Sequence, residues 1–122
     1  MTDSDRRFPR SVYRHGDEPD ARFSLANERT FLAWIRTSLA LLAGGVALET
    51  LGLGLQPDLR LAASVLLIVT GILTPIQAWL GWTRSERALR MNRPLPAAHL
   101  ALPLGIVVIV VGVLVLLGIV LA

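Results

Sequence analysis

Three arginines recur at heptad spacing in the first half of the chain, at positions 22, 29 and 36. Residues seven apart drift only about 20° around an α-helix, so Arg22, Arg29 and Arg36 form one stripe if the segment is helical. Guanidinium groups beside apolar segments act as topology signals or contact anionic lipid headgroups. We therefore take Arg29 and Arg36, with Arg84 beside the second apolar block, as candidate anion- or headgroup-binding residues.

Arg36 and Glu49 are the charged residues nearest the interior of the first apolar block. Twelve uncharged residues separate them, about 20 Å of helix, whereas the hydrocarbon core of a bilayer is about 30 Å thick. The two residues therefore cannot both lie outside the core. Arg36 can extend back to the headgroups, because helical side chains lean toward the N-terminus. Glu49 leans toward the membrane centre, which leaves four alternatives: it is protonated, hydrogen-bonded across helices, paired with an arginine of a neighbour, or interfacial because the helix ends near Leu48.

Two further stripes of small or polar residues predict close contacts between helices. The first lies on another face of the same helix and comprises Ser38, Gly45, Glu49 and Gly52. The second lies on the next apolar segment and comprises Thr70, Thr74, Gln77 and Gly81, ending at Arg84. Pro75 has no N–H to bond the Gly71 carbonyl, which is left free for a partner. We favour contacts between helices over a conduit as the role of the two threonines and the glutamine.

The composition places most of the chain in a membrane. Hydrophobic residues make up 53 % of 122 residues, the mean hydropathy is +0.59, and the apolar residues occur in blocks. The absence of cysteine excludes a disulfide, a thiol nucleophile and a thiolate metal site. We expect no catalytic residue, no cofactor and no metal. The arginines gather beside the apolar blocks, so we expect membrane lipids, chiefly anionic ones, as partners rather than nucleic acid.

The predicted fold class is all-α: an integral membrane protein with three transmembrane helices. Residues 1–22 mix charge with proline and glycine and are expected to form a flexible cytoplasmic tail, and residues 23–122 the transmembrane domain. The predicted spans are about 31–55, 59–82 and 100–122, with Ser24 as the N-cap of the first helix and a second helix continuing to about residue 91. Arginines are concentrated in the tail and the second connection, whereas the first connection holds only Arg60. The N-terminus is therefore predicted inside and the C-terminus outside.

Residues 22–48, RFSLANERTFLAWIRTSLALLAGGVAL, resemble the YidH-like family of small three-span bacterial membrane proteins, catalogued as a domain of unknown function. The specific part runs from Asn27 to Thr37, and residues 82–87 (WTRSER) are a weaker likeness. The same membrane domain is found in the eukaryotic vacuolar transporter chaperone complex, where it forms a multimer around a basic pore for polyphosphate. The resemblance implies that Glu28, Arg29 and Arg36 are the charged first-helix positions and that Arg84 belongs to a second basic ring. This chain has no polymerase or phosphate-sensing domain, so the resemblance implies binding or conduction rather than synthesis.

Two hypotheses for function follow, both for a multi-pass protein of the inner membrane of a bacterium. The first is a structural or accessory role for a homo-oligomer that scaffolds a partner or binds anionic lipid. The alternative is a pore or transport subunit for an anion such as phosphate or polyphosphate, lined by the first-helix arginines. An enzyme is the weakest interpretation, because Glu49 is the only intramembrane carboxylate and no histidine, cysteine or serine constellation accompanies it.

Overall fold

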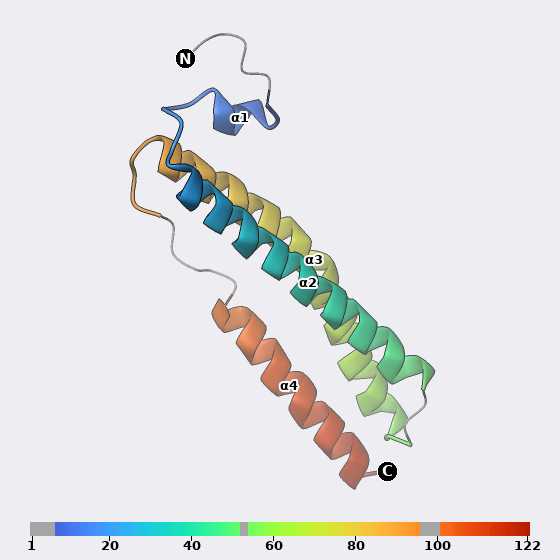
Figure 1. Ribbon diagram of the computed structural model, residues 1–122. Helices are drawn as coiled ribbons and strands as arrows, with labels where there is room; N and C mark the ends of the chain where they lie inside the picture. Colours follow the sequence, from blue (N-terminus) through green and yellow to red (C-terminus); the bar gives the residue numbers. More distant parts are fainter. Residues whose placement is uncertain (1–6, 52–53, 96–100) are drawn as a thin grey trace.

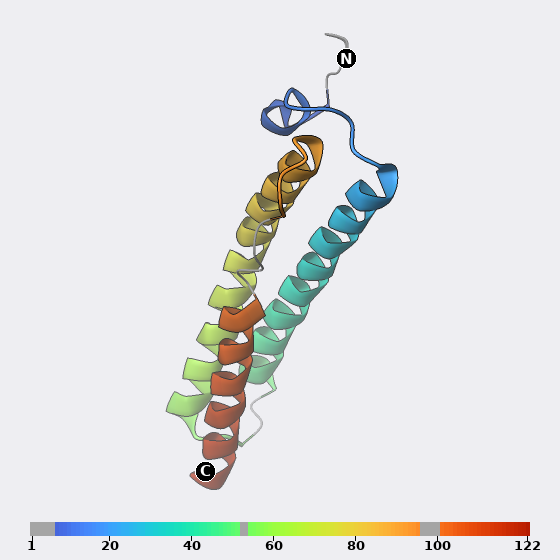
Figure 2. The ribbon, with the colours of Figure 1, turned by 90° about the vertical axis from the view of Figure 1, so that its left-hand side faces the viewer.

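The protein is a long helical hairpin with a third helix packed along half of its length (Figures 1 and 2). The computed structural model describes residues 7–51, 54–95 and 101–122, and within these ranges the regular elements are α1 (Arg10–Tyr13), α2 (Ala21–Thr50), α3 (Pro57–Arg90) and α4 (Ala101–Val120). Three of them, Ala21–Thr50, Pro57–Arg90 and Leu102–Val120, are long and apolar enough to cross a membrane. The predicted all-α fold with three spans is confirmed. Gly52, residues 1–6 of the predicted tail and residue 100 of the predicted third span lie outside the described residues.

The helices begin at other residues than the sequence predicts. Asp20, not Ser24, is the N-cap of α2, and its carboxylate accepts a hydrogen bond from the Arg22 N–H at 2.9 Å. The carboxylate there also neutralises the positive end of the helix, which an uncharged serine one turn later does less well. The helix ends at Thr50, whereas the predicted first span extends to residue 55. Gln56 caps α3 with its side chain at 2.8 Å from the Leu59 nitrogen, and Pro57 occupies the first turn.

The hairpin between α2 and α3 is held together along a regular seam of the first helix. Residues at alternating spacings of three and four are buried or half-buried there, namely Ser24, Asn27, Phe31, Trp34, Ser38, Leu41, Gly45 and Leu48. This is the heptad pattern that packs antiparallel helices at a shallow angle. Small residues allow the closest approach: a Cβ added at Gly45 would lie 3.0 Å from the Ser64 carbonyl oxygen. The contact that we predicted from Ser38 and Gly45 is therefore present.

α4 packs on α3 near the first connection. Leu48, Leu55 and Ala63 form a buried cluster, and Val111, Leu114 and Val115 of α4 pack against it. The backbone N–H of Gln56 donates to the Gly118 carbonyl at 3.0 Å, so a polar bond also ties α4 to this connection. The other faces of α4 expose apolar side chains, as expected of a lipid-facing helix: Ile106, Val108, Ile109, Val113 and Leu116.

We call the end of the hairpin formed by residues 21–30 of α2 and 79–90 of α3 the basic end. α1 lies just beyond it, and the C-terminal residue lies at the opposite end of the molecule (Figures 1 and 2).

Candidate functional site

Arg29 and Arg36 lie on the face of α2 that none of the described helices covers. Both side chains are exposed, and both occupy the heptad position farthest from the seam with α3. Within the part of the chain that the structure describes, neither has a hydrogen-bond or ion-pair partner. The same heptad position continues with Ala43, which is also exposed. We call the exposed row of Arg29, Arg36 and Ala43 the arginine face. Glu28, beside it, is exposed as well.

The depth of Arg36 follows from the length of the hairpin. Arg29 and Glu49 are twenty residues apart in one continuous helix, about 30 Å, which matches the thickness of the hydrocarbon core. With Glu49 at one boundary and Arg29 at the other, the backbone of Arg36 lies about 10 Å inside the core. A guanidinium at that depth requires an extended side chain, water or an acidic partner, because an isolated charge in hydrocarbon is costly.

Glu49 is paired within the hairpin. Its carboxylate oxygen Oε2 lies 3.6 Å from Nε of Arg60 on α3, and both side chains are partly exposed. Glu49 is the penultimate residue of α2, where the helix dipole disfavours a negative charge, and the arginine offsets that effect. Of the alternatives for Glu49, the structure shows two together: an arginine partner on the adjacent helix and a helix that ends directly afterwards.

A single hydrogen bond joins the two helices in the middle of the hairpin. The Ser38 hydroxyl is buried and donates to the Gly71 carbonyl at 2.6 Å. Gly71 is the residue whose carbonyl Pro75 leaves unbonded, so the prediction that this carbonyl is free for a partner is confirmed. Pro75 therefore creates the acceptor that Ser38 uses.

The polar stripe on α3 is only partly engaged with the neighbouring helix. Thr74 is buried and Thr70 half-buried, and their hydroxyls donate within α3, to the carbonyls of Thr70 and Leu66. Gln77 is exposed, and a Cβ added at Gly81 would meet nothing within 4 Å. The stripe is thus buried at Thr74, but the hydroxyls of both threonines bond within α3 rather than across to another helix.

The most buried charges among the described residues lie at the basic end, at positions that were not predicted as sites. Glu86 is 3 % exposed, and its two carboxylate oxygens accept from Ser24 Oγ at 2.7 Å and from Asn27 Nδ2 at 3.3 Å. The Asn27 amide also donates to the Trp82 carbonyl at 3.1 Å. Three polar side chains of α2 and α3 therefore form a closed network that satisfies a buried carboxylate.

Arg90 is also 3 % exposed and holds the segment that precedes α2. Its guanidinium donates to the carbonyls of Tyr13 and His15, at 2.9 and 2.8 Å, and to the Glu18 carboxylate at 2.7 Å. The pKa of Glu18 is lowered from 4.5 to about 2 by its hydrogen bonds to the guanidinium groups of Arg7 and Arg90.

The segment of residues 7–20 is therefore docked against α3. Gly16 makes the docking fit, because its φ is +60° and an added Cβ would lie 2.1 Å from the Arg90 carbonyl oxygen. The Asp17 N–H donates to that same carbonyl at 2.9 Å and so caps the end of α3.

A spacing signal for this end was present in the sequence. Ser24 and Asn27 are three residues apart, and Glu86 and Arg90 are four apart, so each pair lies on one face of its helix. Their pairing required the register between the helices, which no local pattern supplies.

Arg84 lies apart from the arginine face, on the side of α3 that lines a cavity with Arg87 and Arg93. The structure thus separates Arg84 from Arg29 and Arg36 within one chain. Among the described residues, no group of three histidine, cysteine, aspartate or glutamate side chains could hold a metal ion. The exposed groups available for chemistry are chiefly cationic donors, which suit binding of an anion.

Comparison with known proteins agrees with the architecture. Residues 22–88 match the family described as "Domain of unknown function (DUF202)". The chain is 45 % identical over 107 residues to the "Inner membrane protein YidH" of Escherichia coli (strain K12), covering 86 % of this chain and 92 % of that protein. It is 47 % identical over 100 residues to an uncharacterised protein of Mycobacterium tuberculosis, covering 81 % of this chain and 82 % of that protein. No solved structure matches. With its three spans, the chain is a multi-pass inner-membrane protein, and it belongs to the DUF202 family of YidH-like proteins.

Proposed function

We propose that the protein is a structural or accessory subunit of the inner membrane rather than an enzyme, and that it self-associates through the arginine face of α2. Its basic end faces the cytoplasm in this proposal, as the arginine distribution predicts, and binds anionic lipid headgroups. The Escherichia coli relative is named an inner membrane protein and the matching family is described as a domain of unknown function, which is compatible with this role.

The observation that carries the proposal is that Arg36 is exposed and has no hydrogen-bond or ion-pair partner among the residues that the structure describes. With Arg29 and Glu49 at the two boundaries of the hydrocarbon, its backbone would lie about 10 Å inside the core. Lipid tails offer no acceptor for a guanidinium, whereas a second copy or a partner subunit can supply carbonyl oxygens, carboxylates or trapped water. Small side chains on the same side of α2, Ala40, Ala43 and Ala47, are exposed and would let another helix approach closely.

The absence of cysteine from the sequence makes a clean test of self-association possible. We expect Ala43→Cys, on the arginine face, to form disulfide-linked dimers in native membranes on mild oxidation. Ile109→Cys, on the exposed apolar side of α4, is the matched control and is expected to stay monomeric. Equal cross-linking of both variants, or of neither, would contradict the proposal.

A second candidate function, an anion pore, is favoured by one specific feature. Arg29 and Arg36 share one heptad position and are both uncovered, so a symmetric oligomer closed through this face would bring their guanidinium groups to a common axis. Rings of arginine attract polyanions and phosphate. This function is tested by measuring the flux of phosphate or short polyphosphate into proteoliposomes. If the protein is a pore, we expect flux in the wild type that Arg36→Ala alters. Unchanged flux in that variant would exclude Arg36 from the path.

A further inference from the structure

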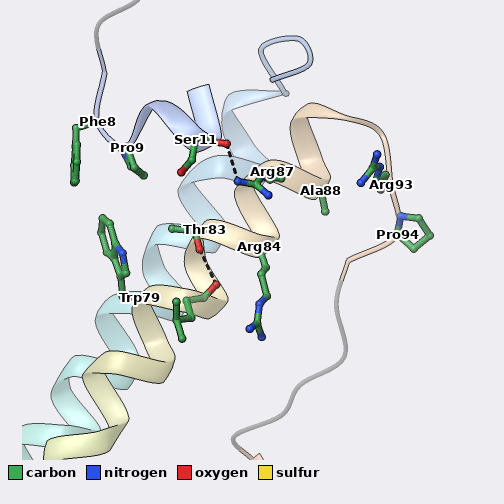
Figure 3. A pocket seen from close by; sticks show the side chains of 11 residues that line it. Phe8, Pro9, Ser11, Trp79, Thr83, Arg84, Arg87, Ala88, Arg93 and Pro94 are labelled. Atoms are coloured by element: carbon green, nitrogen blue, oxygen red, sulfur yellow. Dashed lines mark hydrogen bonds between the residues drawn. The ribbon is translucent and has the colours of Figure 1, made fainter. Parts of the chain in front are cut away.

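A basic cavity opens on the side of α3 at the basic end, between this helix and the docked N-terminal segment (Figure 3). Its volume is about 560 Å³, within the range of pockets that hold small organic ligands. The N-terminal segment supplies Phe8, Pro9 and Ser11, and α3 with its following turn supplies the rest. In Figure 3 the Phe8 and Trp79 rings stand at one side of the cavity and the side chains of Arg84 and Arg93 at the other. The two rings are stacked, with centroids 6.2 Å apart.

The charge of the cavity is of one sign. Arg84, Arg87 and Arg93 line it, and no carboxylate does. The Arg87 guanidinium donates one hydrogen bond, from Nη2 to the Ser11 carbonyl at 2.8 Å. The side chains of Arg84 and Arg93 have no protein partner within the described ranges. The lining thus offers several guanidinium N–H donors whose positive charge an anion would neutralise.

The helix end positions the third arginine. Asn92 adopts a left-handed conformation with φ 52°, the Arg93 N–H donates to the Ala88 carbonyl at 2.9 Å, and the Asn92 N–H donates to Leu89 at 3.4 Å. This pair of bonds is the Schellman motif, which reverses the chain at the end of a helix. It folds Arg93 back beside Ala88, so that Arg93 faces the same cavity as Arg84.

With Arg60 at one boundary of the hydrocarbon core, the cavity would lie across the other boundary, between hydrocarbon and headgroups. Counting from Arg60 at the opposite boundary, about 30 Å of α3 ends at Leu80, so Trp79 and Leu80 lie at the hydrocarbon edge. Arg84 lies about 6 Å farther on, within the headgroup layer, which is about 5–7 Å thick on each side. From the cavity toward the middle of α3, the exposed side of the helix is apolar, with Ile76 and Leu80 on the surface. One wall thus suits an acyl chain and the other suits a phosphate.

We propose that this cavity binds one phospholipid of net negative headgroup charge, such as phosphatidylglycerol. Its phosphate lies between Arg84 and Arg93, and an acyl chain follows Trp79 and Leu80. Phosphate is the chemistry that the arginines recognise, and the continuous apolar wall makes a lipid, rather than free phosphate, the occupant. This inference rests on the headgroup binding in the proposed function and gives it a defined site.

Binding to the full-length protein in detergent is measured by native mass spectrometry during titration with phosphatidylglycerol, phosphatidylcholine or inorganic phosphate. We expect tighter binding of phosphatidylglycerol to the wild type. Each arginine near an anionic headgroup contributes about five-fold to affinity, so Arg84→Gln with Arg93→Gln is expected to weaken that binding about 25-fold. Arg10→Gln with Arg14→Gln removes the same amount of charge from exposed positions of the docked segment. This control variant is expected to bind phosphatidylglycerol as tightly as the wild type.

Other outcomes overturn the inference. Equal losses in the two double variants would mean diffuse attraction to basic charge rather than a site. Inorganic phosphate that binds and depends on Arg84 and Arg93, without preference between the two lipids, would assign the cavity to a soluble anion. Helical circular dichroism establishes that each variant is folded, and Ala43→Cys cross-linking in the Arg84→Gln, Arg93→Gln background reports separately on self-association, so failure of the lipid site is distinguished from failure of the proposed function.

Discussion

The bond from Ser38 to the Gly71 carbonyl depends on Pro75, and this dependence can be measured. In the wild type the proline supplies no N–H to Gly71, so Ser38→Ala leaves a buried carbonyl unsatisfied. Hydrogen bonds between membrane helices contribute about 0.6 kcal/mol on average and at most about 1.7 kcal/mol. The Ser38 bond is short and the residue is 2 % exposed, so we expect Ser38→Ala to lower the free energy of unfolding by about 1–1.5 kcal/mol.

In a Pro75→Ala background the alanine N–H can bond the Gly71 carbonyl within α3, and Ser38→Ala should then cost about 0.5 kcal/mol or less. The difference, a coupling of about 0.5–1 kcal/mol, is obtained from a double-mutant cycle by reversible unfolding in mixed micelles. The effect of Pro75→Ala alone cancels in the cycle. The same cost for Ser38→Ala in both backgrounds would refute the idea that the proline creates this acceptor.

Three further predictions concern packing and the docked segment. Gly45→Val places a Cβ 2.6 Å from the Ile68 side chain and should destabilise the hairpin by about 1–3 kcal/mol in the same unfolding assay, whereas Gly112→Val, with open space around it, should not. Arg90→Gln removes charge-assisted bonds to the docked segment, so trypsin should cut after Arg10 roughly tenfold faster or more; an unchanged rate would mean that other contacts hold the segment. Because the pKa of Glu18 is lowered from 4.5 to about 2 on docking, its contribution is complete above pH 4.5 and is lost as the pH falls toward 2. Its side chain is 63 % exposed, so pepsin cleavage of the segment should rise only modestly across that window, and Glu18→Gln should abolish the rise.

The spans could be predicted from sequence because the relevant signal is local. Blocks of apolar residues of membrane-spanning length identify the three helices, and the small residues Ser38 and Gly45 identify the contact face of α2. The free carbonyl at Gly71 was also predictable, because a proline has no N–H to donate to the carbonyl four residues before it.

The basic end could not be predicted in the same way. Glu86 and Arg90 belong to a segment that looks like an exposed amphipathic helix, yet both are 3 % exposed. Their burial depends on Ser24 and Asn27 across the hairpin and on a docked segment whose own sequence lacks an apolar face. Contacts of that kind follow from helix register and from backbone carbonyls, and no residue type marks the carbonyls of Tyr13 and His15 as the acceptors of Arg90.

The register of the hairpin has a mechanical consequence. Polar contacts at four levels join α2 to α3: Ser24 with Glu86, Asn27 with Trp82, Ser38 with Gly71, and Glu49 with Arg60. Sliding one helix past the other by a single turn, about 5.4 Å, would break all four at once. The two helices therefore cannot act as a piston and instead move together as one stiff rod. α4 is packed mainly through aliphatic side chains, so the hairpin can tilt against it more easily than its own two helices can slide. A displacement at the basic end would therefore be transmitted along the hairpin to the opposite side of the bilayer.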